Sequence, residues 1–547
     1  MGKQISAAEE LAKGQKSISI AEFFERNRHL LGFDNKRKGL LTTVKEAVDN
    51  SLDAAEEAGI LPEIDVEIHN IKDDKYRIVI EDNGPGIVEE QIPKIFAKLL
   101  YGSKFHRLKM QRGQQGIGIS AAVMYAQLTT GKPVTIRSKI GPDEEGHKFK
   151  LKIDTKKNKP KIVSHRTFDW ADKDHGTRIE LDLIGSYRRG RRSVDEYIRE
   201  TAIINPHATL TYVNPHGKQV ILVRATEEHP KETKEIKPHP HGVEIGMLMK
   251  MAHRTDASTI NQFLKNDFTR VGRKTAKSIL DQAKLRDGIK PQTLKRGEAE
   301  KLIDAIKETD IMSPPTDCIA PIGAELLEKG LKKEVNAEFY SSTTRSPEVY
   351  RGNPFLIEAA VAWGGEIDAE GSATLFRYAN RVPLLYQKGG CAATEAVSKT
   401  NWKNYGLKQS GNNLPKGPLV IVVHIASVWV PFTSEAKEAI AHYPEIIKEI
   451  KLAVQELGRD LKKYLRKKRS VKKELKKRQY IKTYIPHIAE ALHDILGDDT
   501  DTDSIEANLS TLLEQKRGKV KEMKFDPSKN KEYDKEIAEI GRDGKSE

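Results

Sequence analysis

The pattern of apolar and polar positions predicts alternating helices and strands in the first 225 residues of the chain. Apolar residues recur at helical spacing over residues 40–59, which predicts an amphipathic helix that ends at Gly59. Apolar and charged residues then alternate over 64–68 and 76–80, which predicts two strands. Similar patterns predict a helix at 90–100, a helix at 119–128 and strands at 134–138, 147–153 and 177–183. We expect this region to fold as an α/β sandwich.

The pattern changes near residue 226, where a proline- and histidine-rich segment precedes a compact helical stretch at 243–307. A second α/β unit follows, with strand-like segments at 355–363, 372–385 and 418–430. The fold class predicted is therefore α+β with several domains.

The last part of the chain has helical periodicity and many charges. An approximate helical stripe begins at about Glu435 and becomes strongly basic over 459–478, which predicts one long helix. The sequence after Asp498 is charged and poor in aromatic residues, so we expect a weakly ordered tail.

Amino-acid composition limits the cellular environment and the kinds of partner that we expect. Lys and Arg outnumber Asp and Glu by 93 to 79 in 547 residues, and this basic balance favours a polyanionic partner without identifying it. The two cysteines, Cys318 and Cys391, are too few for a disulfide framework or a zinc ligand set. The polar start lacks a signal peptide, and the longest apolar stretch, 418–432, is shorter than the roughly 20 residues that span a bilayer. We expect a cytoplasmic protein with no membrane partner.

Glu46 and Asn50 lie one helical turn apart and, with Asp53, on one polar face of the predicted first helix. A carboxylate such as Glu46 can orient or deprotonate water, and the amide oxygen of Asn50 can bind Mg²⁺ held by phosphates. A single Glu-x-x-x-Asn is common, so this pair alone does not define a site.

Two glycine-containing segments add to this pair. Asp82 ends a predicted strand and begins Asp-Asn-Gly-Pro-Gly, where its carboxylate can accept a hydrogen bond from an exocyclic amine such as that of adenine. The segment 113–118, Gly-Gln-Gln-Gly-Ile-Gly, precedes a helix and can surround phosphate with backbone N–H groups. It is neither a Walker motif nor a Rossmann turn. The three elements in this order predict a nucleotide pocket.

This order resembles that of the GHKL ATPases, the superfamily of type II topoisomerases, Hsp90-like chaperones, sensor histidine kinases and MutL-like repair proteins. The resemblance implies an α/β-sandwich ATPase in which Glu46 is the general base, Asn50 the Mg²⁺ ligand and Asp82 the adenine contact. Ser120 is a departure, because some relatives have lysine there. The ATP-binding residues that the resemblance implies are Asn50, Asp53, Asp82, Gly86, Ser103, Lys104, Gly113, Gln114, Gln115, Gly116, Ile117, Gly118, Ile119, Ser120, Thr177 and Lys437.

Sequences outside the pocket resemble, more narrowly, the B subunits of topoisomerase VI, a type IIB topoisomerase. The resemblance lies in Ser-Pro-Pro-Thr-Asp-Cys at 313–318 and in segments 376–385 and 430–439. It implies that Lys437 is a catalytic switch lysine, which reaches from a transducer domain to the γ-phosphate. The implied domains are an N-terminal strap (1–20), a GHKL ATPase domain (21–225), a helix-two-turns-helix domain (226–308), a transducer with a long C-terminal helix (309–480) and a charged tail (481–547).

The same resemblance implies an ATP-hydrolysing subunit that uses ATP and Mg²⁺ to drive DNA through a double-strand break, relaxing supercoils and decatenating DNA. The break is assigned to a partner A subunit in an A2B2 assembly, because we find no Toprim-type carboxylate cluster or catalytic tyrosine context. Binding of ATP is expected to dimerise the B subunit around double-stranded DNA. The rival class is a non-cutting GHKL clamp or chaperone, MutL-like or Hsp90-like, which would not predict the inserted helical domain.

DNA contacts are predicted in the helical domain, where a glycine turn leads into a helix with several cations. A merely solvated basic helix is an equal alternative on this pattern. The candidate DNA-binding residues are Arg270, Arg273, Lys274 and Lys277.

Overall fold

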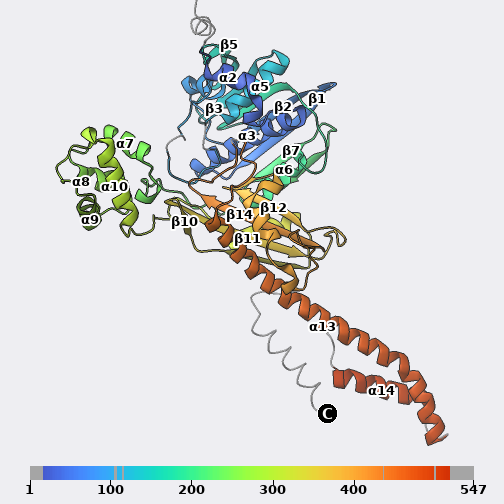
Figure 1. Cartoon of the computed structure of the whole chain (residues 1–547). Helices are drawn as coiled ribbons and strands as arrows, with labels where there is room; N and C mark the ends of the chain where they lie inside the picture. The colour runs from blue at the N-terminus through green and yellow to red at the C-terminus, as the bar shows by residue number, and fades with distance from the viewer. Residues whose placement is uncertain (1–16, 104–106, 114–115, 435, 498–500, 518–547) are drawn as a thin grey trace, which may run out of the picture.

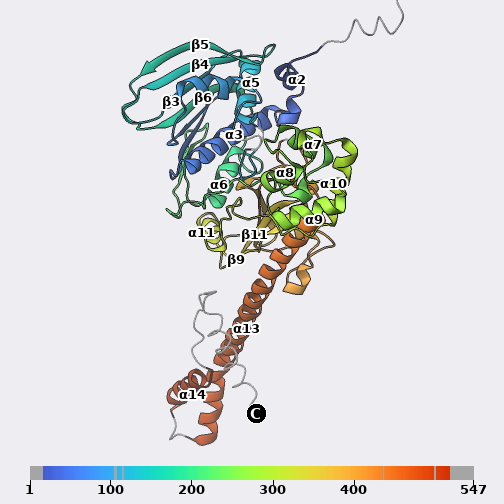
Figure 2. The same ribbon diagram turned by 90° about the vertical axis from the view of Figure 1, so that its left-hand side faces the viewer.

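The computed structural model describes residues 17–103, 107–113, 116–434, 436–497 and 501–517. An N-terminal α/β region lies above a second α/β region, a helical domain stands to one side, and one long helix projects away (Figures 1 and 2). This arrangement agrees with the predicted fold class.

The N-terminal region is an eight-stranded sheet in the order β5-β4-β3-β6-β2-β1-β7-β8, with helices packed on it. Apart from the parallel pair β1 and β7, its neighbouring strands are antiparallel. The strands are β1 (Glu63–Lys72), β2 (Lys75–Asp82), β3 (Val134–Lys139), β4 (Gly146–Asp154), β5 (Lys159–Phe168), β6 (Gly176–Ile184), β7 (Thr209–Val213) and β8 (Gln219–Leu222). The helices are α2 (Ile20–Arg26), η1 (Arg28–Leu31), α3 (Lys36–Glu57), η2 (Glu89–Gln91), α4 (Ile92–Ala97), α5 (Gly118–Thr130) and α6 (Val194–Ile204).

Helix α3 positions the predicted polar pair. The side chain of Asn35 caps its first turn by accepting a hydrogen bond from the backbone N–H of Lys38 at 2.9 Å. Apolar residues at helical spacing, among them Val44 and Leu52, are fully buried against the sheet. The polar face that carries Glu46 and Asn50 therefore points away from this core.

The predicted strands at 64–68 and 76–80 are confirmed as β1 and β2, and their buried positions alternate as expected. The expected helix at 90–100 is shorter, because η2 and α4 together span only 89–97. The sequence pattern did not predict β5. Nearly all its residues are exposed at the edge of the sheet, so they carry no alternation of apolar and polar residues.

The helical domain has its own hydrophobic core, built around Leu248, Phe263, Ile279 and Leu302. This agrees with the compact helical stretch predicted at 243–307. Its elements are η3 (Pro240–Gly242), α7 (Ile245–Arg254), α8 (Ile260–Asp267), α9 (Arg273–Ala283), η4 (Pro291–Thr293) and α10 (Arg296–Glu308).

The second α/β region contains a six-stranded sheet in which β10, β11, β14, β12 and β13 lie in that order and β9 also pairs with β11. Its central strands β11 and β14 are almost completely buried, as continuous apolar runs predict. The elements are α11 (Ala324–Glu334), β9 (Phe339–Thr344), β10 (Glu348–Tyr350), β11 (Asn353–Trp363), β12 (Thr374–Ala379), β13 (Val382–Pro383), η5 (Lys388–Gly390), α12 (Ala392–Ser398), η6 (Trp402–Tyr405) and β14 (Leu419–Ser427).

The long helix was predicted to begin near Glu435, but α13 begins at Pro444 and runs to Leu496. Proline suits the first turn of a helix and forces the preceding residue out of the helical conformation, and Tyr443 is indeed extended. With 53 residues, α13 is about 80 Å long. It continues through the predicted boundary at residue 480.

The expectation of a weakly ordered tail is wrong for residues 502–517. They form helix α14 (Thr502–Arg517), which packs against α13 and buries Leu513. This contact supplies the order that its charged composition did not predict. Within the described residues, no helix is long and apolar enough to cross a membrane.

Candidate ATP site

A cavity of about 320 Å³ lies beside α3 and α5 and is also lined by a loop of the second α/β region. This volume is within the range of small-molecule sites. The described residues of the predicted ATP site that line it are Glu46, Asn50, Asp82, Gly86, Ser103, Gly113, Gly116, Ile117, Gly118, Ile119, Thr177 and Lys437.

The carboxylate of Glu46 lies against the N-terminal end of α5. A Cβ atom added to Gly118, the first residue of that helix, would be only 1.7 Å from Oε2 of Glu46. A side chain at this position would displace the carboxylate of Glu46 from where it lies. The arrangement brings a potential base next to free backbone N–H groups at the positive end of a helix.

Asn50 faces the beginning of the glycine-rich segment. A Cβ atom added to Gly113 would be 3.9 Å from Oδ1 of Asn50. The amide oxygen of Asn50, a suitable ligand for Mg²⁺, thus lies close to the loop that is predicted to hold phosphates.

Asp82 is buried and held in place by three donors. Its carboxylate accepts hydrogen bonds from Oγ of Ser51 at 2.7 Å and from the backbone N–H groups of Gly84 and Thr177 at 3.0 and 3.1 Å. Burial raises the pKa of Asp82 above its ordinary value. The following turn needs glycine, because Gly86 has φ +74° and an added Cβ would meet the backbone oxygen of Lys139 at 2.0 Å.

Lys437 enters the cavity from the second α/β region. Its buried Nζ donates a hydrogen bond to the backbone oxygen of Arg112 at 3.1 Å, immediately before Gly113. The residue lies in a turn with φ +52°, ahead of Pro444. The prediction that it lies on the long helix is therefore wrong. Next to it, Glu438 forms an ion pair with Lys38 of α3 at 2.6 Å. These two contacts join the two α/β regions at the cavity.

Two predicted site residues are turned elsewhere. Asp53 does not line the cavity, and its carboxylate forms an ion pair with Arg112 at 2.9 Å. Ser120 is buried, and its hydroxyl donates to the backbone oxygen of Ile117 at 3.0 Å. Three other predicted contacts, Lys104, Gln114 and Gln115, lie outside the described residues.

Polar residues that the sequence pattern did not predict as part of the site lie on the same helix as Glu46. Lys45 lines the cavity, and burial lowers its pKa. Asp49 is buried and accepts a hydrogen bond from the hydroxyl of Tyr197 at 2.9 Å, and burial raises its pKa to about 6. Their positions next to Glu46 and Asn50 in the sequence were the only available signal.

Arg112, another residue that the sequence pattern did not predict, forms a buried charge network at the base of the glycine-rich segment. Its guanidinium forms ion pairs with two carboxylates of α3, that of Asp53 and, at 2.6 Å, that of Glu56. Burial alone would raise the pKa of Glu56, but the charge of Arg112 lowers it well below the usual range. Glu56 also lies 3.9 Å from Nη1 of Arg381, a residue of the second α/β region. The network therefore connects α3, the glycine-rich segment and the second sheet.

Comparisons with known proteins agree with this geometry. The family model described as "Histidine kinase-, DNA gyrase B-, and HSP90-like ATPase" matches residues 35–157. The fold and this match define an ATPase of the GHKL class. A second family model, "Topoisomerase VI B subunit, transducer", matches residues 314–478.

Relatives define the family more closely. The chain is 53% identical over 493 residues to the B subunit of type 2 DNA topoisomerase 6 from Methanococcoides burtonii, covering 90% of this chain and 79% of that protein. It is also 53% identical over 482 residues to the protein of the same name from Archaeoglobus fulgidus, covering 88% of this chain and 80% of that protein. The chain belongs to the topoisomerase VI B subunit family. Among solved structures, the B-subunit of the DNA gyrase from Myxococcus xanthus matches 81% of this chain and 95% of its own, with 12% identity and a TM-score of 0.40.

Proposed function

We propose that this chain is the ATP-binding and ATP-hydrolysing subunit of a type II DNA topoisomerase and acts with a partner A subunit on DNA. ATP drives one DNA segment through a double-strand break made by the A subunit, which relaxes and decatenates DNA. The observation that carries the proposal is the hydrogen bond from Lys437 to Arg112, because it joins the second α/β region to the ATP cavity. We further propose a cytoplasmic location.

Hydrolysis is assigned to the groups around the cavity. We propose that Glu46 orients and deprotonates the attacking water, since its carboxylate lies against the N-terminus of α5. The amide oxygen of Asn50 is the proposed ligand for Mg²⁺, a hard cation that prefers oxygen. When bound, Mg²⁺ supplies positive charge that offsets the charge of the phosphates. Asp82 is proposed to accept a hydrogen bond from the adenine amine.

Lys437 is the proposed sensor of the γ-phosphate. In the described structure its ammonium group donates a hydrogen bond to a neutral carbonyl, that of Arg112. A phosphate anion in the same cavity would attract the ammonium group more strongly than this carbonyl does. A change of partner by Lys437 would move a turn of the transducer, which gives hydrolysis a mechanical consequence.

Dimerisation on ATP binding is proposed to use the N-terminal strap, 1–20, and the adjoining helix α2. Residues 1–16 lie outside the described part. Within it, Ile18, Ile20 and Phe23 are each more than 40% exposed, which is consistent with a surface that a second copy covers.

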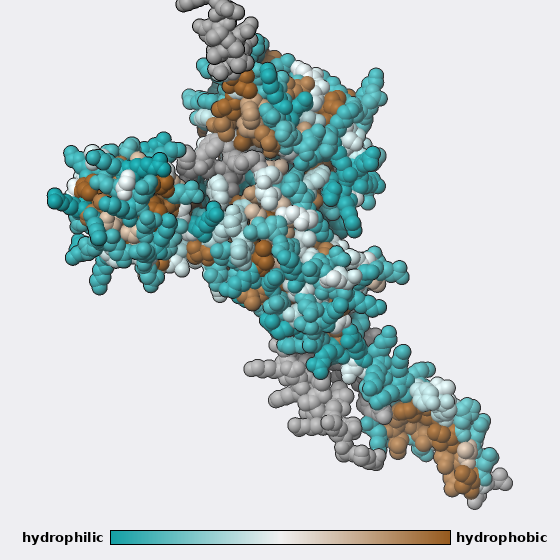
Figure 3. Space-filling view, in the orientation of Figure 1, coloured by the Kyte–Doolittle hydropathy of each residue, from teal (hydrophilic) through white to brown (hydrophobic). Residues whose placement is uncertain are grey.

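The A subunit is proposed to dock at the far end of α13. Apolar side chains gather there on the surface, along α13 and α14 (Figure 3). Tyr480, Tyr484, Ile488 and Ile495 are between 45% and 78% exposed, and a large exposed apolar patch commonly marks a protein interface. Two copies of each subunit, A2B2, complete the proposed assembly.

DNA is proposed to contact the N-terminal end of α9. Arg273, Lys274 and Lys277 are exposed there, and the first turn contains no acidic residue. Cations at this end are unfavourable for the helix dipole, whereas a DNA phosphate would interact favourably with both the cations and the free N–H groups. Arg270 is oriented by donating from Nε to the backbone oxygen of Ser313 at 3.0 Å.

We retain the domain division at residues 20, 225, 308 and 480 as part of this proposal, with the last boundary lying inside the continuous helix α13. The boundary at 308 is supported by the end of α10 at Glu308.

The test of the proposed function is reconstitution with a tyrosine-bearing A subunit. We expect ATP-dependent relaxation of supercoiled DNA by the mixture and ATP hydrolysis by this chain alone. Hydrolysis without relaxation, with every A subunit that associates, would favour a non-cutting clamp instead.

A further inference from the structure

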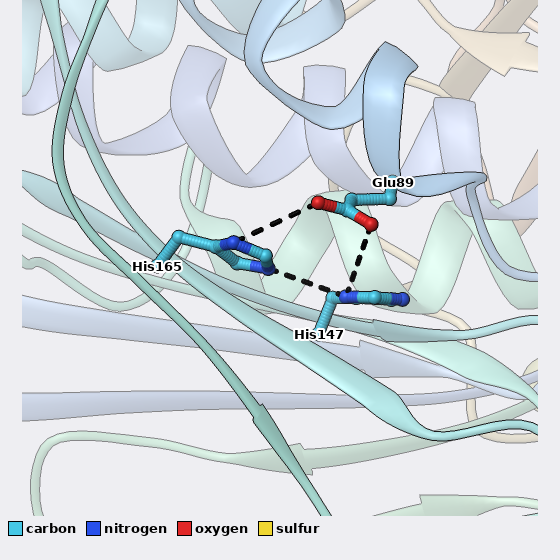
Figure 4. A group of neighbouring side chains, drawn as sticks. All are labelled: Glu89, His147 and His165. Carbon is cyan, nitrogen blue, oxygen red and sulfur yellow. Dashed lines mark hydrogen bonds and ion pairs between the residues drawn. The ribbon is translucent and has the colours of Figure 1, made fainter.

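Glu89, His147 and His165 form a cluster of potential metal ligands at the edge of the N-terminal sheet (Figure 4). The two histidines lie on the neighbouring strands β4 and β5, and Glu89 belongs to η2. His165 is paired with Phe149, two residues from His147, so the histidines are diagonal neighbours on one face of the sheet. The three side chains converge from three separate segments of the chain.

The distances within this cluster suit a metal ion. Nδ1 of His147 and Nε2 of His165 are 3.2 Å apart. Two imidazole nitrogens bound to a tetrahedral Zn²⁺ are separated by about 3.3 Å, given Zn–N bonds of about 2.0–2.1 Å. Oε2 of Glu89 lies 3.9 Å from Nδ1 of His147, and one ligand atom from each of the three residues lies within 4.8 Å of the others.

The histidine side chains are also held by the fold. The ring of His165 stacks on Phe149 with centroids 4.0 Å apart and an angle of 11° between the planes. Phe149 is buried in the core of the N-terminal region, so it fixes the position of the imidazole. A pre-organised pair of nitrogen ligands loses little conformational entropy when it binds a metal.

We propose that Glu89, His147 and His165 bind a divalent transition metal of the Zn²⁺ type and leave at least one position for water. Two nitrogen ligands and one carboxylate favour Zn²⁺, Co²⁺ or Ni²⁺ over Mg²⁺ and Ca²⁺, which prefer oxygen alone. The site is separate from the Mg²⁺ that accompanies ATP and does not depend on the proposed topoisomerase activity.

The metal would stabilise the segment that follows the Asp82–Gly86 turn. Glu89 lies three residues after Gly86, which lines the ATP cavity, and α4 next to it packs against β4 and β5. A bond from Glu89 through the metal to His147 and His165 would tie this segment to the edge hairpin. The expected role is structural support for one wall of the ATP cavity.

The test uses the untagged full chain, treated with a chelator and then titrated with Zn²⁺ by calorimetry or with Co²⁺ by visible absorption, without nucleotide. We expect one strong site per chain and a Co²⁺ spectrum typical of nitrogen and oxygen ligands. His147→Ala, His165→Ala or Glu89→Gln should each weaken binding by more than about tenfold. Zn²⁺ should also raise the melting temperature of the unmodified chain but not that of a His147→Ala/His165→Ala variant.

His69→Ala is the matched control. His69 is exposed on β1 and pairs with one carboxylate, Glu67, at 2.8 Å, but it is not part of a three-ligand group among the described residues. This variant should bind Zn²⁺ as the unmodified chain does. The proposal is overturned if the unmodified chain shows no strong site, or if the His147→Ala/His165→Ala variant, folded by circular dichroism, binds Zn²⁺ with unchanged affinity.

Discussion

Glu46 and Gly118 show how single residues shape the end of the cavity that is proposed to be catalytic. The carboxylate lies where the Cβ of a larger residue at position 118 would be, so glycine at 118 lets the acid approach the helix end this closely. Asp82 shows the same dependence on its neighbours, because two of its three donors are backbone N–H groups fixed by the fold. At this scale the site is a set of close backbone approaches as much as a set of reactive side chains.

Replacing Glu46 by Gln should abolish most of the ATPase activity and leave ATP binding largely intact. Loss of a general base typically lowers kcat by about 10²- to 10⁴-fold. Single-turnover hydrolysis and equilibrium nucleotide binding, measured separately, check this. Glu57→Gln is the control, because Glu57 lies on the same helix and pairs with Lys109 at 3.1 Å. Equal kcat in the two variants would remove Glu46 from the mechanism.

Asp49 should make stability depend on pH. Burial raises its pKa from 3.8 to about 6, so the folded state binds this proton more tightly than the unfolded state does. The contribution of Asp49 to the free energy of unfolding is therefore fully present below the unfolded pKa and is lost as pH rises through about 6. Asp49→Asn should lack this contribution to the pH dependence.

The measurement is the melting temperature of both proteins between about pH 5 and about pH 7.5, since this interval contains the folded pKa. Relative to Asp49→Asn, the unmodified chain should lose stability as the pH rises. A constant difference between the two proteins over this interval would contradict the raised pKa.

At the scale of elements, the turn that carries Lys437 and helix α9 are the parts with proposed moving or binding roles. The turn precedes α13 and contacts the residue before Gly113, so it lies between the long helix and the glycine-rich segment. Helix α9 packs into the separate hydrophobic core of the helical domain, and its basic N-terminal end is exposed to solvent.

Lys437→Met should uncouple ATP binding from DNA passage. Methionine keeps much of the apolar stem but removes the charge that is proposed to sense the γ-phosphate. We expect relaxation with the A subunit to fall by more than about tenfold, the effect of about 1.4 kcal/mol. Lys399→Met is the control, since Lys399 forms a surface pair with Glu395 within α12 and its C-cap. Relaxation at the same rate in both variants would contradict the sensor role.

Replacing Arg273, Lys274 and Lys277 together by Ala should weaken DNA binding and its dependence on salt. Each lost phosphate contact reduces the slope of log K against log salt by about 0.9. Binding to a short duplex at several salt concentrations checks this. Arg296→Ala is the control in the same domain, because Arg296 is exposed and pairs with Glu300 at 3.1 Å. An unchanged slope in the triple variant would identify α9 as a merely solvated helix.

At the scale of the whole molecule, a buried charge network and a projecting helix join distant functions. Arg112, Glu56 and Arg381 connect α3 to the second sheet beneath the cavity. From that sheet α13 extends for about 80 Å to an exposed apolar surface (Figures 1 and 3). Direct contacts therefore link the cavity, the second sheet and the helix that carries the proposed A-subunit surface.

Tyr480→Asp combined with Ile488→Asp should prevent association with the A subunit. Two charges in an apolar interface cost several kcal/mol, which corresponds to more than about a hundredfold in affinity. ATP hydrolysis by this chain alone should persist, because these residues are far along α13 from the cavity. Co-purification and analytical ultracentrifugation with the A subunit check this. Lys482→Asp, on the same helix, is the control for added charge, and equal association by both variants would place the interface elsewhere.

The sequence by itself determined the class of fold, the order of the nucleotide motifs and most elements. This information is local: periodicity reports which face of a helix or strand is buried, and glycine motifs report turns. It failed where local pattern is weak, as in the exposed edge strand β5, and where a tertiary contact orders a charged segment, as in α14.

Only the tertiary structure decided which distant residues meet. It placed Lys437 against the residue before Gly113, directed Asp53 toward Arg112 and away from the cavity, and brought Glu89 to His147 and His165. These contacts join residues that are between about 60 and more than 300 positions apart, and their geometry follows from how whole layers pack. The spacing of these residues in the sequence does not predict this geometry, because the contacts form only after both regions have folded.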